Sequence, residues 1–398
     1  MVWINFLHLY QPANTDWNNI REALDKSYWR LIRLLDEHPD RKFTFNISGC
    51  LLERMKEEGE TEFTRRIKVL LDKGQIELTG SAAYHAFLPL LPKEEVISQI
   101  KENEEILKEH FGKNFKAKGF FFPEMAYSSE VAKVVKDLGY EWIILDEIAY
   151  SGKGYKKPKF DRYYIDKASD LKVVFRDRKL SSAYAPDKLG PISRRIKRER
   201  EKGRLKEKIY FLTATDSELY GLRHEDPTAE VEKIAKMREI ETITVSEFIG
   251  QVDEKKVEEI KVHPSSWETS LDDMKSKQPY RLWLDKKNKI QINLWKFANL
   301  CLKANNKFEK DDNHYWSRWH LSRGLASCTF WWASANDFSK IFGPYAWNPD
   351  VVEKGLEDLV RSVRSINDKK SVKEKILAEK YYTNIKELIW REHWKKHW

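Results

Sequence analysis

The chain has 398 residues, 41% of them hydrophobic and 34% charged, which is the balance of a folded globular protein. This length accommodates one large barrel domain with a helical attachment, or two to three smaller domains. No apolar run approaches the roughly 20 residues that a membrane-spanning helix needs, so we expect a soluble protein without a membrane partner.

The net charge of +9 raises the alternative of a nucleic-acid-binding protein. Apart from residues 194–208 and the C-terminal residues 391–398, however, Lys and Arg alternate with Asp and Glu, as they do on solvated helix faces. We therefore expect no nucleic-acid partner. Abundant Lys and Glu with few Gln is also the composition of heat-adapted proteins with surface ion pairs.

The N-terminus and the cysteines indicate a cytoplasmic protein. Residues 1–10 are apolar but have no basic leader and no small-residue cleavage site, which favours a first strand over a signal peptide. Cys50, Cys301 and Cys328 are widely spaced and form no CxxC pair, so we expect reduced, buried thiols.

Short apolar or β-branched runs, typical of buried strands, recur along the first 220 residues. They are residues 3–10, 42–48, 76–82, 118–124, 142–147, 171–177 and 208–216. Helical periodicity fills most of the intervals, as in 20–38, 93–111 and 128–138, the last beginning with a possible Ser cap and ending at Gly139. Seven alternating units predict a parallel (β/α)7-type barrel in the α/β class, and no GxGxxG motif follows any strand.

The pattern changes after residue 250. We expect a catalytic barrel over 1–250, a linker or active-site loop over 251–284 and a C-terminal α-helical bundle over 285–398. Residues 262–280 are polar and rich in Ser, Asp and Pro, the composition of a long loop that reaches over a barrel mouth.

Polar side chains gather where at least five of the predicted strands end. In a parallel barrel the loops after the strands converge on one face, where function lies. The residues at these strand ends are His8, Tyr10, His85, Glu124, Arg176, Asp177, Asp216 and Glu218.

Glu124 stands after three phenylalanines and a proline, where an unpaired buried carboxylate would cost about 2 to 7 kcal/mol. Glu124 and Asp216, on different strands and surrounded by aromatic residues, form the pair of carboxyl groups that a glycosidase requires. Aromatic side chains offer sugars an apolar face and help raise the pKa of the carboxyl group that must stay protonated.

Four stretches, HLYQP, SAAYHAFLPLLP, GFFFPEMAY and TDSELYG, resemble in order and spacing four sequence regions of glycoside hydrolase family 57. The resemblance spans residues 4–225 and implies a retaining enzyme that acts on α-glucans, on a seven-stranded barrel followed by helices. It implies Glu124 as the nucleophile and Asp216 as the general acid/base, with His8 and His85 bonding the sugar. No metal or other cofactor is implied.

The chain departs from the family pattern at Tyr10, where a second His is usual, so a sugar contact is expected to change. A fifth family region can be placed loosely on residues 325–336, where Trp331 and Trp332 would wall the acceptor side. The chain is short beside many members, which favours short oligosaccharides over long branched polymers.

Structural roles remain open for several of these residues. Asp216 could be a helix N-cap, and Arg176 and Asp177 could pair with each other. Glu218 would face the same side as Asp216 in an extended segment, where it could either tune the pKa of Asp216 or be structural. His8 and His85 could be core histidines. His393 and His397 have the i, i+4 spacing of a helical metal site but lack further ligands.

Three other functions remain as alternatives. A 4-α-glucanotransferase or branching enzyme would use the same two carboxyl groups with a sugar in place of water as acceptor. A metal-dependent deacetylase would need an Asp and two His as ligands, but the first strand carries no Asp and no HxxxH motif occurs outside the C-terminal tail. A non-catalytic carbohydrate-binding protein could retain the groove without turnover.

Overall fold

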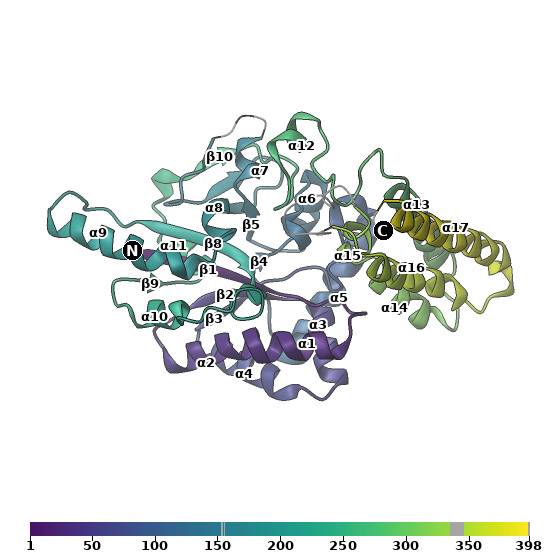
Figure 1. The fold of residues 1–398 in the computed structure, drawn as a ribbon, viewed down its shortest axis with the longest axis horizontal. Coiled ribbons are helices and arrows are strands. Elements are labelled where there is room, and N and C mark those ends of the chain that lie inside the picture. Colours follow the sequence, from purple (N-terminus) through teal and green to yellow (C-terminus); the bar gives the residue numbers. More distant parts are fainter. Residues whose placement is uncertain (153, 155, 335–345, 397–398) are drawn as a thin grey trace. The chain divides into compact units, whose positions relative to one another are not determined.

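The computed structural model describes residues 1–152, 154, 156–334 and 346–396 of the chain (Figure 1). The chain divides into two compact units. Unit 1 comprises Met1–Gln11, Thr15–Ala83 and Pro92–Trp267, and unit 2 comprises Pro12–Asn14, Tyr84–Leu91 and Glu268–Trp398. The boundary after Trp267 falls inside the expected linker, whereas the two early stretches of unit 2 have no signal in the sequence.

Unit 1 contains a ring of seven strands, and each overlaps one of the seven runs expected from the sequence. They are β1 Val2–Leu9, β2 Phe43–Ile47, β3 Ile76–Leu78, β4 Gly119–Phe120, β5 Trp142–Asp146, β7 Lys172–Arg176 and β8 Tyr210–Asp216.

Parallel pairing gives the orders β3-β2-β1-β8 and β4-β5-β7. A parallel bridge between Gly80 and Phe120 joins β3 to β4, and the Asp177 amide donates to the Leu212 carbonyl at 2.8 Å between β7 and β8. The expected (β/α)7-type barrel with a C-terminal helical region is confirmed.

The barrel interior is filled by every second residue of its strands, as strand geometry requires. Val2, Ile4 and Phe6 of β1 belong to the same core cluster as Trp142 and Ile144 of β5. Leu212 and Ala214 of β8 complete one side of it.

The helix α11, Val245–Gln251, packs against this core at the amino ends of the strands. Phe248 and Ile249 of α11 belong to the core cluster, and Thr244 begins the helix with a capping box that includes Glu247. The Trp142 indole donates to the Ser246 hydroxyl at 2.9 Å. α11 thus covers the barrel interior at this end, and in parallel barrels the functional site lies at the opposite end, where the strands have their carboxyl ends.

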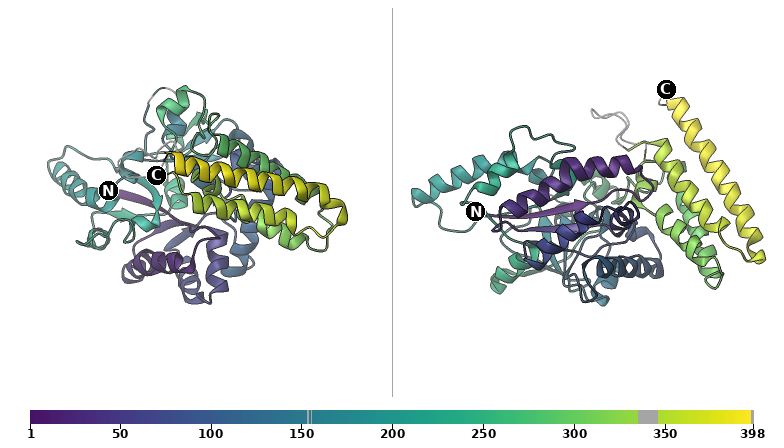
Figure 2. Two further views of the ribbon diagram at one scale, coloured as in Figure 1. Left: turned by 45° about the vertical axis from the view of Figure 1, so that its right-hand side comes forward. Right: turned by 90° about the horizontal axis from the view of Figure 1, so that it is seen from below.

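Helices cover the outside of the strands, and Figures 1 and 2 show α1 and α2 running beside β1 as one long helix. The helices are α1 Trp17–Ala23, α2 Trp29–Glu37, α3 Gly49–Glu57, α4 Thr61–Asp72, α5 Lys93–Phe111, α6 Ser129–Asp137, α7 Ile148–Ser151, α8 Arg178–Ser181, α9 Ala185–Glu201 and α10 Glu230–Lys236. The Ser128 side chain caps α6 by accepting from the Val131 amide, as expected.

Three short strands lie outside the ring: β6 Tyr164–Asp166, β9 Glu241–Thr242 and β10 Glu258–Ile260. β6 runs antiparallel to β7 and parallel to β10, and β9 pairs with β1 at its amino end. None was expected from the sequence.

Unit 2 is helical, with α12 Leu271–Lys275, α13 Lys289–Lys307, α14 His314–Gly324, α15 Ser327–Trp331, α16 Pro349–Arg364 and α17 Val372–Lys396. Figure 2 shows the long helices packed side by side. A Cβ on Gly324 would lie 2.8 Å from Leu359 of α16, so glycine permits the close approach of α14 to that helix.

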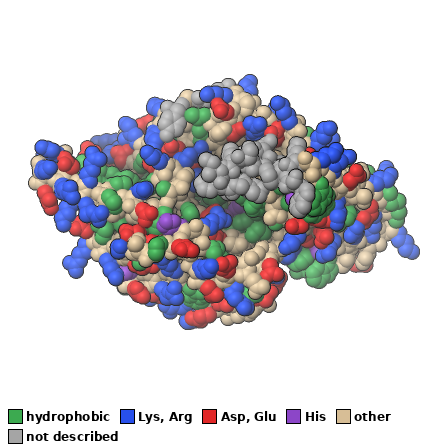
Figure 3. All heavy atoms as spheres, in the orientation of Figure 1, with side chains coloured by type: hydrophobic (Ala, Val, Ile, Leu, Met, Phe, Trp, Pro, Cys, Tyr) green, Lys and Arg blue, Asp and Glu red, His purple; other side chains and the backbone are tan. Residues whose placement is uncertain are grey.

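The surface carries both signs of charge. Figure 3 shows Lys and Arg interspersed with Asp and Glu on the face viewed, including the region of the basic helix α9. Lys197 of α9, for example, pairs with Glu239 at 3.0 Å. No helix among the described residues has the length and apolar character to cross a membrane.

Candidate active site

Polar residues continue the inward-facing rows of the barrel at the carboxyl ends of the strands. In four strands the residue two positions after an apolar core residue is ionisable. These pairs are Phe6 and His8, Ile144 and Asp146, Val174 and Arg176, and Ala214 and Asp216.

Glu124 follows the short strand β4, which ends at Phe120, and stands directly after Pro123. The backbone of Glu124 is left-handed, with φ of 62°, and that of Met125 is also, with φ of 49°. A left-handed conformation costs a non-glycine residue about 1 kcal/mol or more, and such strain concentrates at functional sites. The Glu124 residue is 8% exposed.

Trp267 holds Glu124 in place. Its indole Nε1 donates to Glu124 Oε2 at 2.8 Å, and its backbone amide donates to the Glu124 carbonyl at 3.0 Å. The Arg176 guanidinium lies 5.4 Å from the Trp267 ring, and Arg178 Nη2 donates to the Trp267 carbonyl at 3.0 Å. Trp267 lies in the polar segment 262–280 and was not singled out in the sequence.

His8 is buried and neutral at ordinary pH, because burial lowers its pKa to about 4. Its Nδ1 lies 2.8 Å from Asn46 Oδ1, and the Asn46 amide nitrogen donates to Thr79 Oγ1 at 3.2 Å. This orientation of Asn46 makes Nδ1 the protonated nitrogen and Nε2 the acceptor of the His8 ring. Such an acceptor suits a sugar hydroxyl.

Aromatic rings surround His8. The Phe121 ring is 4.7 Å away, and the Trp267 ring is 6.1 Å away. Tyr10, at the position where the family usually has His, stacks on His8 at 5.7 Å. His8, Phe121, Trp267 and Glu124 therefore form one contiguous wall of the barrel mouth.

Asp216 ends β8 and lies directly opposite His8 in the β1–β8 register. Arg223 Nη1 donates to Asp216 Oδ2 at 2.7 Å, and the Asp216 side chain is 25% exposed. Asp216 precedes a 3-10 turn, Ser217–Leu219, but its side chain makes no capping hydrogen bond there. The N-cap alternative therefore has no support in the geometry.

Glu218 lies inside this 3-10 turn, so the expectation of an extended segment is wrong. Its carboxyl group is buried and accepts from the Tyr28 hydroxyl at 2.5 Å and from Gln11 Nε2 at 2.8 Å. Burial, and next the charge of Asp216, raises the pKa of Glu218 to about 7. Tyr28 was not predicted from the sequence.

Arg176 and Asp177 do not pair with each other. Arg176 Nε donates to Asp146 Oδ2 at 2.7 Å, and Arg178 Nε donates to Asp146 Oδ1 at 2.8 Å. Asp177 caps α8 by accepting from the Leu180 amide at 2.8 Å. The buried Asp146, which was not predicted as a site residue, thus fixes the two arginines that contact Trp267.

His85, Trp331 and Trp332 belong to unit 2. His85 has φ of 55°, is buried, and places Nδ1 3.0 Å from Ser327 Oγ. The rings of Trp331 and Trp332 lie 4.5 Å apart at the end of α15. Their contact with a sugar, like that of His8 and Tyr10, stays a prediction.

The described residues bring Asp187, His224 and Asp226 together in a geometry that could hold a metal ion. Asp226 Oδ2 already accepts hydrogen bonds from Arg30 at 2.6 Å and from the Tyr184 hydroxyl at 2.7 Å, so this oxygen is engaged by protein donors. His397 lies outside the described residues. The expectation that no metal is required stays a prediction.

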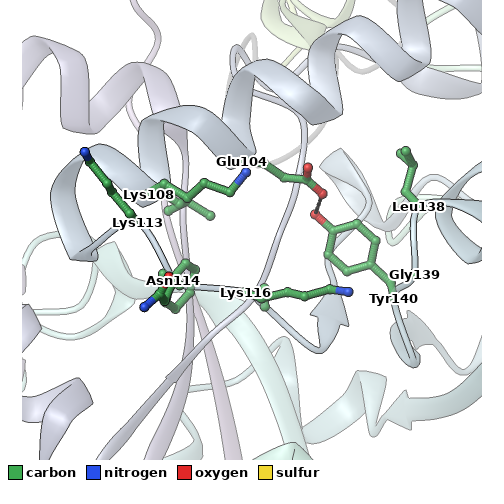
Figure 4. Close-up of a pocket in the computed structure, with 11 residues that line it drawn as sticks. Glu104, Lys108, Lys113, Asn114, Lys116, Leu138, Gly139 and Tyr140 are labelled. Carbon is green, nitrogen blue, oxygen red and sulfur yellow. Dashed lines mark hydrogen bonds between the residues drawn. The ribbon is translucent and has the colours of Figure 1, made fainter.

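A pocket of about 360 Å³ lies near the amino ends of β4 and β5. Figure 4 shows Lys116 reaching across it toward Tyr140, whose hydroxyl donates to Glu104 at 3.0 Å. Lys108 and Lys113 also line it. No predicted site residue is among the described residues that line this pocket.

A closed parallel barrel with acidic and aromatic side chains at its strand ends is an arrangement that barrel enzymes acting on carbohydrates use. The chain belongs to glycosyl hydrolase family 57, whose sequence profile matches residues 3–263. The expected family is confirmed.

Two curated relatives illustrate the similarity. An α-amylase of Pyrococcus horikoshii is 32% identical over 177 residues, 43% of this chain and 27% of the relative. A 4-α-glucanotransferase of Thermococcus litoralis is 31% identical over 178 residues, 43% of this chain and 26% of the relative. The matched region is thus only about a quarter of the length of these relatives.

Among solved structures, a family 57 branching enzyme from Thermococcus kodakaraensis superposes with a TM-score of 0.69. The superposition covers 96% of this chain and 95% of the other at 16% identity. This similarity shows the shared fold.

Proposed function

We propose that the protein is a retaining glycoside hydrolase that acts on α-linked glucans or maltooligosaccharides, with Glu124 as nucleophile and Asp216 as general acid/base. The observation that carries the proposal is the placement of Glu124: a buried carboxylate on a left-handed backbone, held by the Trp267 indole at 2.8 Å. A residue without a function would not be expected to accumulate both burial and strain.

In the first step, Asp216 donates a proton to the glycosidic oxygen while a Glu124 oxygen attacks the anomeric carbon. The bond to the leaving sugar breaks, and a covalent glycosyl ester forms on Glu124. Trp267 fixes the plane of the attacking carboxylate through Oε2.

In the second step, the Asp216 carboxylate removes a proton from water as the water oxygen attacks the anomeric carbon. The ester bond breaks, Glu124 regains its charge and the anomeric configuration is retained overall. Neutral His8 would contact a sugar hydroxyl through Nε2 in both steps.

A 4-α-glucanotransferase or branching enzyme is the alternative, because the same two carboxyl groups serve when a sugar hydroxyl replaces water. Relatives with these names, one at 31% identity and one with a TM-score of 0.69, favour this alternative as well. Product analysis from maltooligosaccharides separates the two: hydrolysis releases glucose and shorter chains, whereas transfer redistributes chain lengths.

The same assay tests the catalytic assignment. Glu124→Gln should lower turnover at least about 10³-fold, because the amide cannot form the ester intermediate. Glu130→Gln, which changes an exposed glutamate on α6, is the matched control and should retain full turnover. Unchanged turnover in Glu124→Gln would reject the assignment, and binding without turnover in the unaltered protein would indicate a carbohydrate-binding protein.

The stereochemistry is tested by following the anomer of the first product by NMR. Retention is expected, together with a separation of about 5 Å between the two carboxyl groups in a sugar complex. An inverted product and a separation of about 8 Å would contradict the retaining mechanism.

A further inference from the structure

Asp146 is a buried acid at the carboxyl end of β5, and both of its oxygens accept hydrogen bonds. Arg176 Nε donates to Oδ2 at 2.7 Å, and Arg178 Nε donates to Oδ1 at 2.8 Å. The Ile148 amide also donates to Oδ1, at 3.0 Å. Asp146 is 1% exposed and lies opposite Arg176 in the β5–β7 register. Charge-assisted hydrogen bonds to both oxygens of a buried carboxylate hold the Arg176 guanidinium in one orientation.

The Arg176 guanidinium lies where two sheets of the barrel meet. β7 and β8 belong to different sheets, and the Asp177 amide joins them by donating to the Leu212 carbonyl at 2.8 Å. Two residues further along β8, the Ala214 carbonyl accepts from Arg176 Nη1 at 2.8 Å. The side chain of Arg176 is therefore bonded to β8 two residues before Asp216, with which this strand ends.

The same guanidinium contacts the residue that holds Glu124. Its centre lies 5.4 Å from the Trp267 ring, and Arg178 Nη2 donates to the Trp267 carbonyl at 3.0 Å. Trp267 in turn donates twice to Glu124, from the indole to Oε2 at 2.8 Å and from the amide to the carbonyl at 3.0 Å. The two arginines that Asp146 orients therefore contact both the ring and the backbone of Trp267.

We propose that Arg176 is a positioning residue that fixes Asp216 relative to Glu124. Oriented by Asp146, its guanidinium bonds the strand that ends at one carboxyl group and contacts the indole that holds the other. This inference rests on the proposed catalytic roles of Glu124 and Asp216. A retaining glycosidase requires its two carboxyl groups about 5 Å apart, and a displacement of about 1 Å can lower the rate about 10²-fold.

The substitution Arg176→Lys keeps a positive charge but loses the planar fork that reaches Ala214 and the Trp267 ring. On maltooligosaccharides kcat should fall about 10- to 100-fold while KM changes less than about threefold, because the chemical step suffers more than binding. Asp146→Asn removes the charge that orients Arg176 and should give the same division between kcat and KM. A rise in KM with kcat unchanged would mean that Arg176 binds the sugar, and it would overturn the proposal.

Arg41→Lys is the matched control. Arg41 is also a buried arginine of unit 1, and it donates to backbone carbonyls, from Nε to Ala235 at 2.8 Å and from Nη2 to Met237 at 3.1 Å. It precedes β2, at the amino ends of the strands. Arg41→Lys should lower the melting temperature and leave kcat unchanged. If both lysine variants lower kcat equally, or if neither does, Arg176 is only structural and the proposal is overturned.

A readout without turnover separates this inference from the proposed function. In protein labelled with ¹⁵N at the tryptophan indoles, the resonance absent from Trp267→Phe identifies Trp267. Its indole hydrogen should exchange at least about 10-fold faster in Arg176→Lys, because a less supported ring opens more often, and at an unchanged rate in Arg41→Lys. If this occurs while the unaltered protein shows no turnover, only the proposed function fails. Unchanged exchange in Arg176→Lys overturns the inference, whatever the turnover.

Discussion

The indole hydrogen bond from Trp267 holds Glu124, the proposed nucleophile, in place. Trp267→Phe keeps an aromatic ring for sugar stacking but removes the donor at 2.8 Å from Oε2. Since a hydrogen bond to a charged group contributes about 1.5 to 3 kcal/mol, kcat should fall about 10- to 100-fold with a smaller change in KM. Steady-state kinetics on maltooligosaccharides measure both.

Trp142→Phe provides the comparison, because its indole donates to Ser246 at 2.9 Å at the other end of the barrel. This variant should melt at a lower temperature with kcat unchanged. Equal losses of kcat in the two variants would mean that the effect is one of general stability.

His8 and Glu218 act on stability in opposite directions as the pH changes. The pKa of His8 falls from 6.5 to about 4 on folding, so its unfavourable contribution grows as the pH drops through that range. The pKa of Glu218 rises from 4.5 to about 7, so its favourable contribution is complete below pH 4.5 and is lost as the pH rises to 7. Between pH 4.5 and 6.5 the two contributions offset each other.

Glu218→Gln should therefore expose the His8 contribution. The free energy of unfolding of the variant should rise by about 1 to 2 kcal/mol per pH unit between pH 5 and 6, relative to the unaltered protein. Urea unfolding at these two values measures the slope, and Glu130→Gln should leave it unaltered. If the free energy of unfolding changed with pH equally in the variant and in the unaltered protein, the raised pKa of Glu218 would be contradicted.

At the scale of elements, the turn after β8 leaves no room for a side chain at Gly221. A Cβ there would lie 2.1 Å from the Lys26 carbonyl oxygen, and φ is 125°. Gly221→Ala should lower the free energy of unfolding by about 2 to 4 kcal/mol and reduce kcat. The reason is that the π-helical turn Leu24–Tyr28, which contains Lys26, must move away from the turn that follows Asp216.

Gly203→Ala is the corresponding control, since Gly203 also has a positive φ, 68°, but no atom within 4 Å of the added Cβ. It should cost only the conformational strain of about 1 kcal/mol. Chemical unfolding of both variants measures the difference. Similar costs would show that the close approach to Lys26 has no weight.

The sequence predicted the seven barrel strands because each is buried and apolar, and it placed His8, Glu124, Arg176 and Asp216 at their ends. The extent of β4 could not be predicted, since only the fold shows that its ladder ends at Phe120 although the apolar run continues to Phe122. The strands β6, β9 and β10 are two or three residues long, too short for a periodic signal.

The missed site residues were missed for physical reasons. Asp146 lies in a run that was identified as a strand, and its role depends on two arginines 30 and 32 residues away. Trp267 lies in a polar loop without periodicity, and Tyr28 reaches Glu218 only because of a π-helical turn. Long-range contacts of this kind leave no local pattern.

At the scale of the whole molecule, the chain enters unit 2 at three places, Pro12–Asn14, Tyr84–Leu91 and Glu268–Trp398. Within that unit, Phe87 stacks on Trp283 at 4.5 Å, and Arg323 Nη2 donates to the Ala13 carbonyl at 2.7 Å. A boundary drawn from composition alone cannot reveal such interleaving. The expected borders at 250 and 284 consequently stay predictions.

Residues 1–267 expressed alone should fail to unfold cooperatively, because Phe87 and Ala13 lose the partners that bury and bond them. Calorimetry should give a single transition for the full chain and none for the fragment. Co-expression with residues 268–398 should restore the transition. A fragment with the melting temperature of the full chain would contradict this interdependence.

The left-handed backbone at Glu124 has a consequence for how this chain can be improved. Asparagine or glycine adopts a left-handed backbone at a lower cost than glutamate does, and neither residue would bury a carboxylate at this position. Selection for thermal stability alone should therefore favour variants in which asparagine or glycine replaces Glu124. The most stable of these variants would lack the proposed nucleophile and with it the proposed activity.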